Sequence, residues 1–406
     1  MPNLKKISVS ELRSGMYLHA LSGSWIDHPF WRAKFVIEDL DDIKLIALSK
    51  ISEVWIDVDK GADTRQMVVP AEPAEVPAKA PARVPLIAPK PVSMADEIDR
   101  ARKICDSASK AVQSMFRETR MGRAISMEAA GAVVQDISLS IMRNPGALIS
   151  VVRLKHVDDY TYMHSVAVCA LMVALARQLN LSEADTREAG MAGLLHDLGK
   201  VDTPPEILNK TGRLTDEEFA IVKQHPVQGH AHLKQSGQVG EIAMDVCLHH
   251  HERIDGKGYP HGLAGDDISL FAKMGAVCDV YDAITSNRPY KHGWCPAESI
   301  KRMTEWSVDQ YDKRIFQAFV SSVGIYPVGS LVRLSSGKLG VVMEQSAKSL
   351  IAPRVKVFFS TKSGVYITPT IVDLSQSISE DNAEKIVGYE DAAKWKIRNF
   401  DQMWAG

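Results

Sequence analysis

The sequence predicts a mainly α-helical protein. A small module of mixed helix and strand precedes its helical domain, and a β-rich segment follows that domain. Apolar residues recur at helical spacing from about Met94 to about Val323. Short apolar runs typical of strands lie before residue 60 and after residue 324. Residues 68–92 contain seven prolines, a composition that favours an extended linker over a packed core.

We therefore expect four parts. They are a small α/β regulatory or docking domain over residues 1–66, a Pro/Ala-rich linker over 67–93, a helical domain over 94–324 and a β-rich appendage over 325–406.

The bulk composition is that of an ordinary globular protein. The 406 residues are 45% hydrophobic and 24% charged, and the net charge of −2 gives no attraction to a nucleic acid polymer or an acidic membrane. The five cysteines are scattered and include no CxxC pair, which argues against a disulfide framework and favours the reducing cytoplasm. We find neither a signal peptide nor an apolar run of 18 residues, so we expect no membrane insertion.

Local residue patterns predict where the first strands and helices lie. In the N-terminal module, residues 34–39 and 53–59 are strand candidates on either side of a helix over 41–50. Residues 96–116 and 164–179 have helical periodicity.

Two polar residues are predicted to begin helices within the helical domain. Ser182 is a candidate N-cap, and Thr215 with Glu218 has the spacing of a capping box.

The last part of the chain reads as strands joined by turns. The strand candidates are residues 330–334, 339–344, 354–359 and 364–369, with turns at 335–338 and 360–364.

Histidine and aspartate gather within the helical domain, at His164, His196, Asp197, His225, His249, His250, His251, Asp279 and Asp282. Imidazole and carboxylate are common ligands of zinc, iron, manganese and nickel. Each residue alone has an ordinary explanation, such as a hydrogen-bonded core histidine, a helix end before a proline or a solvated loop. Their combination in one helical block favours a metal site, because a helical bundle brings ligands from several helices to its centre. A carboxylate can bridge two metals, which together lower the pKa of a shared water and hold a phosphoryl group.

Four segments carry a resemblance to a known family, the HD-GYP phosphodiesterases, a branch of the HD hydrolases. They are "LLHDLGK" at 194–200, "ILNKTGRLTDEEFAIVKQHPVQG" at 207–229, "HHERIDGKGYPHGLAGDDI" at 250–268 and "VCDVYDAITSNRPYK" at 277–291. The resemblance covers residues 150–325. It implies an all-α bundle that holds two or three metals and acts on cyclic di-GMP.

The resemblance also implies a ligand set, namely His164, His196, Asp197, His225, His250, His251 and Asp279. His249 is then an extra residue. Members with three metals have a glutamate where this chain has Tyr160, so we expect two divalent transition-metal ions, with Asp197 bridging them. Iron, manganese, nickel and zinc are not distinguished.

Other residues are expected to act on substrate. Lys200 lies one helical turn from His196, and we expect Asp197 and Lys200 to be catalytic. Arg288 and Lys291 correspond to phosphate-binding positions of the family, and cations suit a dinucleotide with two negative charges. We count Lys200, Tyr259 and Asp282 among the substrate-binding residues as well.

The expected reaction is hydrolysis of cyclic di-GMP to linear pGpG, with GMP as the product of a second round. Two alternatives stay open: a receptor of low turnover that signals by protein contact, and a general HD-type nucleotide phosphohydrolase.

The N-terminal module resembles an uncharacterised domain that precedes HD-GYP modules in some bacterial proteins, which implies no chemistry. Protein partners that bind through this domain or the Gly-Tyr-Pro loop, and a homodimer, are further expectations.

Overall fold

The computed structural model describes residues 4–21, 35–37, 43, 53–62, 89–153, 160–286, 293–307, 309–346, 349–376, 384–398, 400 and 402–405. The chain forms two compact units, Met1–Leu86 and Ile87–Gly406. The division falls within the proline-rich segment of residues 68–92.

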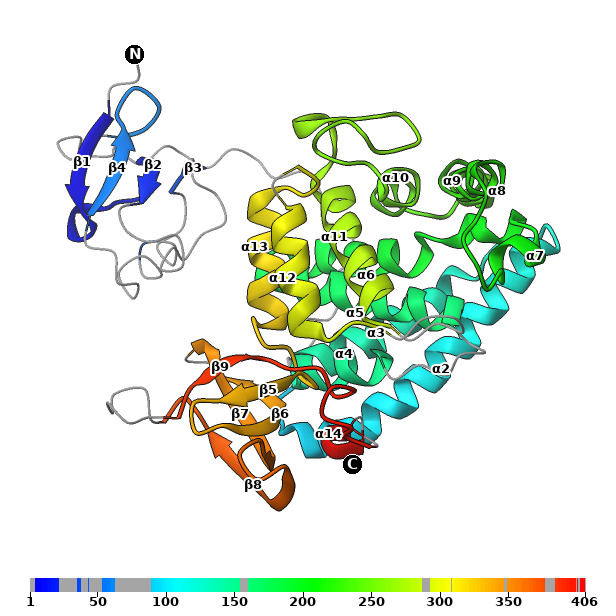
Figure 1. Ribbon diagram of the computed structural model, residues 1–406. Coiled ribbons are helices and arrows are strands. Elements are labelled where there is room, and N and C mark those ends of the chain that lie inside the picture. The colour runs from blue at the N-terminus through cyan, green and yellow to red at the C-terminus, as the bar shows by residue number, and fades with distance from the viewer. Residues whose placement is uncertain are drawn as a thin grey trace. The chain divides into compact units, whose positions relative to one another are not determined.

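The N-terminal unit is built on a small antiparallel sheet with the strand order β1-β4-β2-β3 (Figure 1). Its elements are β1 (Leu4–Ser8), η1 (Val9–Glu11), β2 (Tyr17–Leu21), β3 (Phe35–Val36) and β4 (Glu53–Asp57). The strands predicted over 34–39 and 53–59 are confirmed as β3 and β4, whereas β1 and β2 were not predicted. The helix predicted over 41–50 lies outside the described residues, apart from the helical Ile43.

The larger unit begins with a helical bundle, in agreement with the predicted fold class. Its elements are α2 (Met94–Arg120), α3 (Met127–Arg143), α4 (Pro145–Arg153), α5 (Tyr160–Gln178), α6 (Glu183–Leu195), η4 (Leu198–Asp202), α7 (Pro205–Leu208), α8 (Asp216–Val222), α9 (His225–Ser236), α10 (Glu241–His249), η5 (Gly265–Asp267), α11 (Leu270–Thr285), α12 (Pro296–Trp306) and α13 (Lys313–Val323). Helix α5 packs against α2, α3, α4, α6, α11 and α13, so it is the central helix. Its side chains from Met163 to Ala176 are buried, which explains why it is apolar on all sides.

Polar side chains cap the starts of α6 and α8, the helices that precede His196 and His225. The hydroxyl of Ser182 accepts a hydrogen bond of 3.0 Å from the backbone N–H of Asp185 at the start of α6. Thr215 and Glu218 form the predicted capping box at the start of α8. Helix α6 ends immediately before His196, and α8 ends shortly before His225. The caps set where these two helices begin, and so they help to position the two histidines.

A buried ion pair joins the first two helices of the bundle. Glu97 of α2 accepts hydrogen bonds of 2.7 Å from Nε and Nη2 of Arg143, at the end of α3. The hydroxyl of Ser140 donates a third hydrogen bond, of 2.8 Å, to the same carboxylate. Glu97 is fully buried, so these three bonds replace the water that its charge would otherwise require.

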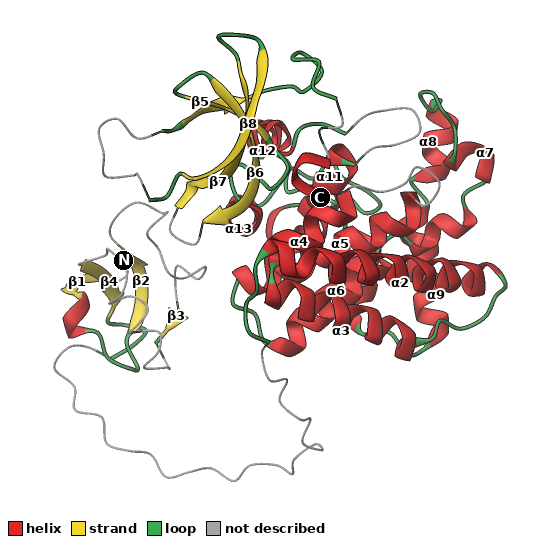
Figure 2. Cartoon of the chain, turned by 90° about the horizontal axis from the view of Figure 1, so that it is seen from below, coloured by secondary structure: helices red, strands yellow, loops and turns green. Residues whose placement is uncertain are grey.

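The C-terminal strands form an antiparallel sheet with the order β8-β7-β6-β5-β9. They are β5 (Leu331–Leu334), β6 (Lys338–Ser346), β7 (Ser349–Ser360), β8 (Val365–Asp373) and β9 (Ile386–Tyr389), followed by α14 (Gln402–Ala405). The sequence predicted β5 to β8 and missed β9. Figure 2 shows the sheet beside the helices.

This sheet shares a hydrophobic core with the helical bundle. Leu339, Val341 and Phe359 of the sheet belong to the same buried cluster as the core residues of α2 to α5. Trp404 of α14 is 2% exposed and packs under the guanidinium of Arg153 from α4. The β-rich segment is therefore packed onto the bundle through apolar contacts.

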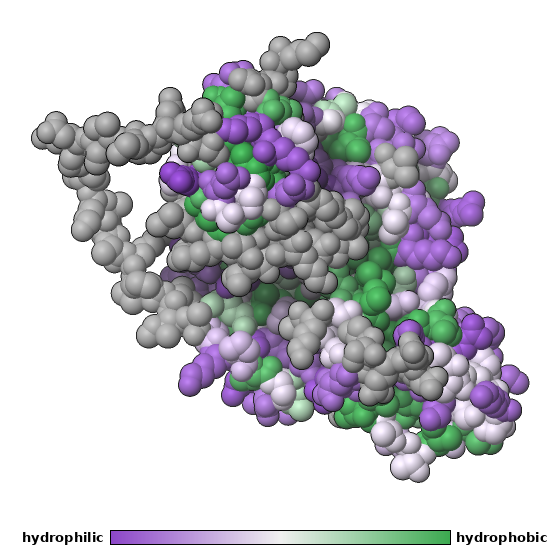
Figure 3. Space-filling model, turned by 90° about the vertical axis from the view of Figure 1, so that its left-hand side faces the viewer, coloured by the Kyte–Doolittle hydropathy of each residue, from purple (hydrophilic) through white to green (hydrophobic). Residues whose placement is uncertain are grey.

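The surface drawn in Figure 3 is a mosaic of hydrophilic and hydrophobic residues. Strand β8, at one edge of the C-terminal sheet, exposes Val365, Tyr366 and Ile371. Within the described parts of the chain, the helices are too short or too polar to cross a lipid bilayer.

Candidate metal centre

The seven predicted ligands come together in one buried cluster. His164 lies near the start of α5, His196 and Asp197 follow α6, His225 begins α9, His250 and His251 follow α10, and Asp279 lies on α11. Three side-chain sets each place their ligand atoms within 4.8 Å of one another: His164, His196 and Asp279; His225, His250 and His251; and His196, Asp197 and His250. The first two sets share no residue, so the cluster has two halves.

Asp197 lies between these two halves. Its Oδ2 atom is 3.4 Å from Nε2 of His164 and 3.4 Å from Nε2 of His196. Its Oδ1 atom is 3.3 Å from Nε2 of His225 and 3.8 Å from Nε2 of His250. One carboxylate thus presents a separate oxygen to each half, which is the geometry of a bridging ligand.

Asp279 also faces both halves. Its Oδ1 atom is 3.0 Å from Nε2 of His164, and its Oδ2 atom is 3.7 Å from Nδ1 of His251.

Backbone carbonyls orient three of the imidazole rings. Nδ1 of His196 donates to the carbonyl of Gly193 at 2.8 Å, and Nδ1 of His225 donates to that of Val222 at 2.7 Å. Nδ1 of His250 lies 3.0 Å from the carbonyl of Val246. Because a carbonyl oxygen can only accept, each Nδ1 carries the hydrogen and the neutral ring directs the lone pair of Nε2 into the cluster.

The donor set fits metal ions. Nε2 of His225 and Nε2 of His250 lie 3.3 Å apart, and two lone pairs at that distance repel each other unless a cation lies near both. Within the described part of the chain, Nε2 of His196 and Oδ1 of Asp197 are buried without a hydrogen-bond partner. A buried polar atom of this kind is costly unless a ligand satisfies it.

The pKa shifts of the cluster residues are also consistent with metal binding. Burial lowers the pKa of His196 and of His250, and it lowers that of His251 to about 3. Burial alone would raise the pKa of Asp197, but Lys200 and the neighbouring histidines lower it well below its usual range. These imidazoles are therefore neutral and the carboxylate is charged at neutral pH, which are the protonation states that coordinate metals.

The pKa of His164 shifts in the opposite direction to those of the other three histidines. Burial alone would lower its pKa, but hydrogen bonds to Asp197, Asp279 and Asp282 raise it to about 10. Three carboxylates around one imidazole form a site where a proton or a metal cation balances the negative charge.

Two glycines allow α9 to approach η4 closely enough to bring His225 beside Asp197. A Cβ atom on Gly199 would lie 1.9 Å from the carbonyl oxygen of His225 and 2.4 Å from the backbone nitrogen of Gly229. No larger residue fits at position 199, so the glycine in "HDLGK" has a structural role in assembling the cluster.

Glu252, directly after the three histidines, holds the Gly-Tyr-Pro loop. Its buried carboxylate accepts hydrogen bonds from the backbone N–H groups of His261, Gly262 and Leu263, at 2.7, 3.1 and 3.1 Å. A Cβ atom on Gly258 would lie 2.5 Å from Cα of Glu252. Sequence reasoning did not identify this role of Glu252, because its partners lie nine to eleven residues away in an irregular loop.

His249 lies apart from the metal-ligand sets. Its Nδ1 bonds Oδ1 of Asp245 at 2.7 Å, and its Nε2 lies 3.1 Å from Nδ1 of His261. Within the described chain it joins none of the clusters that could hold a metal. This position at the end of α10 agrees with the expectation that His249 is an extra residue.

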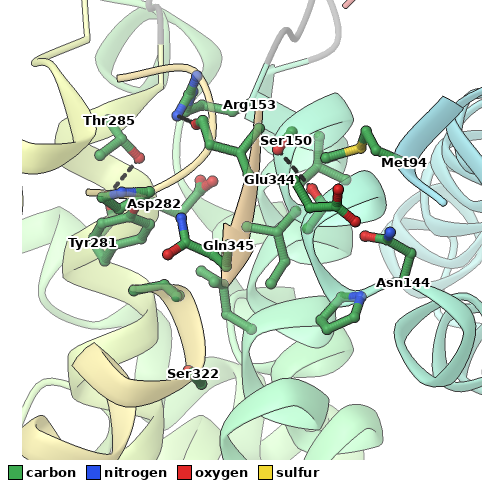
Figure 4. A pocket seen from close by; sticks show the side chains of 18 residues that line it. Met94, Asn144, Ser150, Arg153, Tyr281, Asp282, Thr285, Ser322, Glu344 and Gln345 are labelled. Carbon is green, nitrogen blue, oxygen red and sulfur yellow. Dashed lines mark hydrogen bonds between the residues drawn. The ribbon is translucent and has the colours of Figure 1, made fainter. Parts of the chain in front are cut away.

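Asp282, which was predicted to bind substrate, is absent from the described residues that line the cavity over the metal cluster. Its Oδ2 accepts from Nδ1 of His164 at 2.6 Å, and its Oδ1 accepts from the hydroxyl of Ser286 at 3.1 Å. Figure 4 shows Asp282 on the wall of a separate cavity of about 170 Å³, together with Arg153 and Gln345. Asp282 is therefore placed to orient His164 from behind.

A larger cavity opens over the metal cluster. It has a volume of about 560 Å³, within the usual range for small-molecule sites, and Asp197, Asp279, His164, His225 and His251 line it. The cluster is therefore accessible to a ligand, although all of its members except the partly exposed His251 are buried.

Two predicted substrate residues also line this cavity. The ammonium of Lys200 lies 2.5 Å from Oδ2 of Asp197. The ring of Tyr259 stacks on His251 at 4.6 Å between centroids, and burial raises its pKa, so its phenol stays protonated. The other two predicted phosphate-binding residues, Arg288 and Lys291, lie outside the described residues.

Family models match two regions of the chain. Residues 4–130 match a domain of unknown function, DUF3391, and residues 146–315 match the HD domain. The second match contains all seven residues of the cluster.

Curated relatives agree with the HD match. A cyclic di-GMP phosphodiesterase of Pseudomonas aeruginosa is 54% identical over 99% of this chain and 96% of its own length. A cyclic di-GMP phosphodiesterase of Thermotoga maritima is 37% identical over 40% of this chain and 45% of its own length. The 3′3′-cGAMP-specific phosphodiesterase 1 of Vibrio cholerae is 35% identical over 40% of this chain and 38% of its own length.

The HD-domain match, the histidine-aspartate cluster and the similarity along almost the full length of one relative lead to the same assignment. This chain belongs to the HD-GYP family of phosphodiesterases.

Proposed function

We propose that this protein is a metal-dependent phosphodiesterase that opens the ring of cyclic di-GMP to give linear pGpG, with GMP as the product of a second round. The observation that carries the proposal is the position of Asp197 between two ligand sets, at the floor of an accessible cavity. The similarity to a cyclic di-GMP phosphodiesterase over 99% of this chain supports the choice of substrate.

We propose that the site holds two divalent metal ions. One would be held by His164, His196 and Asp279, the other by His225, His250 and His251, and Asp197 would bridge them. Tyr160 stands where members with three metals have a glutamate, which supports two ions over three. Mixed imidazole and carboxylate ligands suit iron, manganese, nickel or zinc.

When bound, such ions supply an activated water at neutral pH and stabilise the charge that develops on the phosphoryl group. In the overall reaction, water cleaves the bond between phosphorus and the 3′ oxygen. Phosphorus gains a hydroxyl group and the 3′ oxygen gains a proton, so the products balance. Asp197 stays ionised because Lys200 and the histidines lower its pKa, and it can therefore act as the bridging anion.

Lys200 is proposed to hold a non-bridging phosphate oxygen. Its ammonium contacts Asp197 and lines the cavity, so a small rotation of its flexible side chain would direct it to a phosphate there. Arg288 and Lys291 are proposed to bind the second phosphate, as the family resemblance implies. Tyr259 can donate a hydrogen bond from its protonated phenol, while its ring supports His251.

We also propose that the protein acts in the cytoplasm. All five cysteines are free, and four of them are buried, which suits a reducing compartment.

The test is a turnover assay on protein purified without oxygen, with products separated by chromatography. We expect cyclic di-GMP to give pGpG first and GMP later. Tight binding without product, in protein whose metal content is complete, would favour the receptor of low turnover. Faster cleavage of unrelated nucleotides than of cyclic di-GMP would favour the general phosphohydrolase.

A further inference from the structure

We propose that the end of α2 and the start of α5 form a guanine-binding subsite in the catalytic cavity, with Arg120 reading the base and Tyr162 stacking on it. This inference rests on the proposed function and deepens it, because it assigns the residues that select guanine over adenine.

An aromatic pair lies at the wall of the cavity. Phe116 of α2 and Tyr162 of α5 both line it, and their ring centroids are 5.5 Å apart at an interplanar angle of 79°. Phe116 is 6% exposed, whereas Tyr162 is partly exposed. Phe116 therefore supports Tyr162 from the core side, and Tyr162 can offer ring surface to a ligand. Nucleobases stack on aromatic side chains of this kind whatever the base.

Arg120 adds a donor that can distinguish bases. It lies one helical turn after Phe116, at the end of α2, and lines the same cavity. Among the described residues, two other cations line the cavity and both are engaged: Lys200 contacts Asp197, and Lys210 bonds both oxygens of Glu218 at 2.8 and 2.6 Å. In the described part of the chain, no carboxylate forms an ion pair with Arg120, which is exposed. Its guanidinium donors are thus available to a ligand.

The chemistry of the two purines explains the choice. Guanine presents two acceptors side by side, O6 and N7, and a guanidinium can donate to both at once. Adenine has an amino donor at position 6, so the same fork would meet one acceptor and one donor. A guanidinium beside a stacking ring therefore favours guanine. Contacts to the two phosphates of the substrate would not distinguish cyclic di-GMP from cyclic di-AMP.

The two residues on α2 lie in the part of the chain that precedes the HD domain. Phe116 and Arg120 lie outside the HD-domain match, which starts at residue 146, and inside the match to the domain of unknown function, which ends at residue 130. Helix α2 packs against α5 and η4, the two elements that carry His164 and Lys200. The segment before the HD domain would thus contribute directly to substrate selection.

The experiment measures kcat/KM for cyclic di-GMP and for cyclic di-AMP in the full-length protein. We expect Arg120→Ala to lower the preference for cyclic di-GMP over cyclic di-AMP by roughly 10- to 100-fold, the discrimination that a bidentate contact to guanine gives. Arg120→Lys, which lacks the planar fork, should lower it nearly as much. Tyr162→Leu should reduce kcat/KM for both cyclic dinucleotides, because stacking does not depend on the base.

Arg117→Ala is the matched control, because Arg117 lies on α2 less than one turn before Arg120 and is exposed outside the cavity. This variant should keep the wild-type preference. An equal loss of kcat/KM for both dinucleotides in Arg120→Ala would mean that Arg120 binds phosphate. Unchanged kcat/KM for both would mean that Arg120 does not contact the substrate. Each result overturns the subsite. Wild-type protein that cleaves bis(4-nitrophenyl) phosphate but not cyclic di-GMP would overturn the proposed function, and the subsite with it.

Discussion

His164 and Asp282 are joined by a hydrogen bond of 2.6 Å between Nδ1 and Oδ2, while Nε2 of the same imidazole lies 3.0 Å from Asp279. The bond links α5 to α11 across 118 residues of sequence. A carboxylate behind a histidine fixes the tautomer of the ring and makes the opposite nitrogen a better ligand. The structure therefore gives Asp282 the position of a supporting residue.

The first prediction concerns this supporting contact. Asp282→Asn keeps the shape of the side chain but removes its charge, so the affinity for metal should fall about 10- to 100-fold. Competition with a chelator of known affinity measures the change. Asp245→Asn is the matched control, because Asp245 bonds Nδ1 of His249 at 2.7 Å outside the ligand sets. Equal loss of affinity in both variants would show that the effect is not specific to His164.

The second prediction separates the three consecutive histidines. His250→Ala and His251→Ala should abolish hydrolysis, because both residues face the cluster. His249→Ala should keep most of the activity, because its ring contacts Asp245 and His261 instead. Turnover of cyclic di-GMP and metal content, measured on the same preparations, check this assignment. Full inactivation of His249→Ala at normal metal content would give His249 a role in the reaction.

The third prediction concerns the ion pair that holds α2 to α3. Burial alone would raise the pKa of Glu97, but hydrogen bonds from Arg143 and Ser140 lower it below its usual range. A carboxylate with a lowered pKa stabilises the fold above the unfolded-state value of about 4.3, and this contribution is lost as the pH falls through the folded-state value. Glu97→Gln should therefore reduce the free energy of unfolding by about 3 kcal/mol at pH 7 and by less at acidic pH.

Denaturant titrations of wild type and variant at several pH values measure this difference. Asp99→Asn is the control, since Asp99 forms an exposed pair with Arg102 on the same helix and should cost less than about 1 kcal/mol. A loss for Glu97→Gln that does not change with pH would contradict the role of its charge.

The fourth prediction concerns the division of the chain. A shortened protein that starts at Ile87 should fold and bind metal, because the boundary between the two compact units falls there and α2 remains complete. A protein that starts at Gly146 should not, because it lacks α2 and α3, whose Val112 and Ile137 belong to the core beneath α5. Circular dichroism and metal analysis distinguish the two. Failure of the longer version would mean that the N-terminal unit supports the fold of the helices.

The helical elements were readable from the sequence for physical reasons, whereas the seven-residue ligand set was implied by the family resemblance. Helical spacing and the caps at Ser182 and Thr215 depend on neighbours within a few residues, so the local pattern reveals them. The four-residue strand β9 was missed because "IVGY" is too short to show alternation and contains a glycine.

Contacts between distant segments were not readable in the same way. The position of Asp282 behind His164 depends on how α5 packs against α11, and that of Phe116 and Arg120 depends on how α2 packs against α5. No spacing rule connects these residues. Arg288 and Lys291 stay predictions.

The most direct test of a centre bridged by Asp197 is elemental analysis of protein purified without oxygen, in wild type and in Asp197→Ala. Because each oxygen of Asp197 faces a different ligand set, we expect two metal ions per chain in the wild type and the loss of both in the variant. Three well-occupied ions in the wild type, or one ion retained at full occupancy in Asp197→Ala, would contradict the bridged two-metal centre.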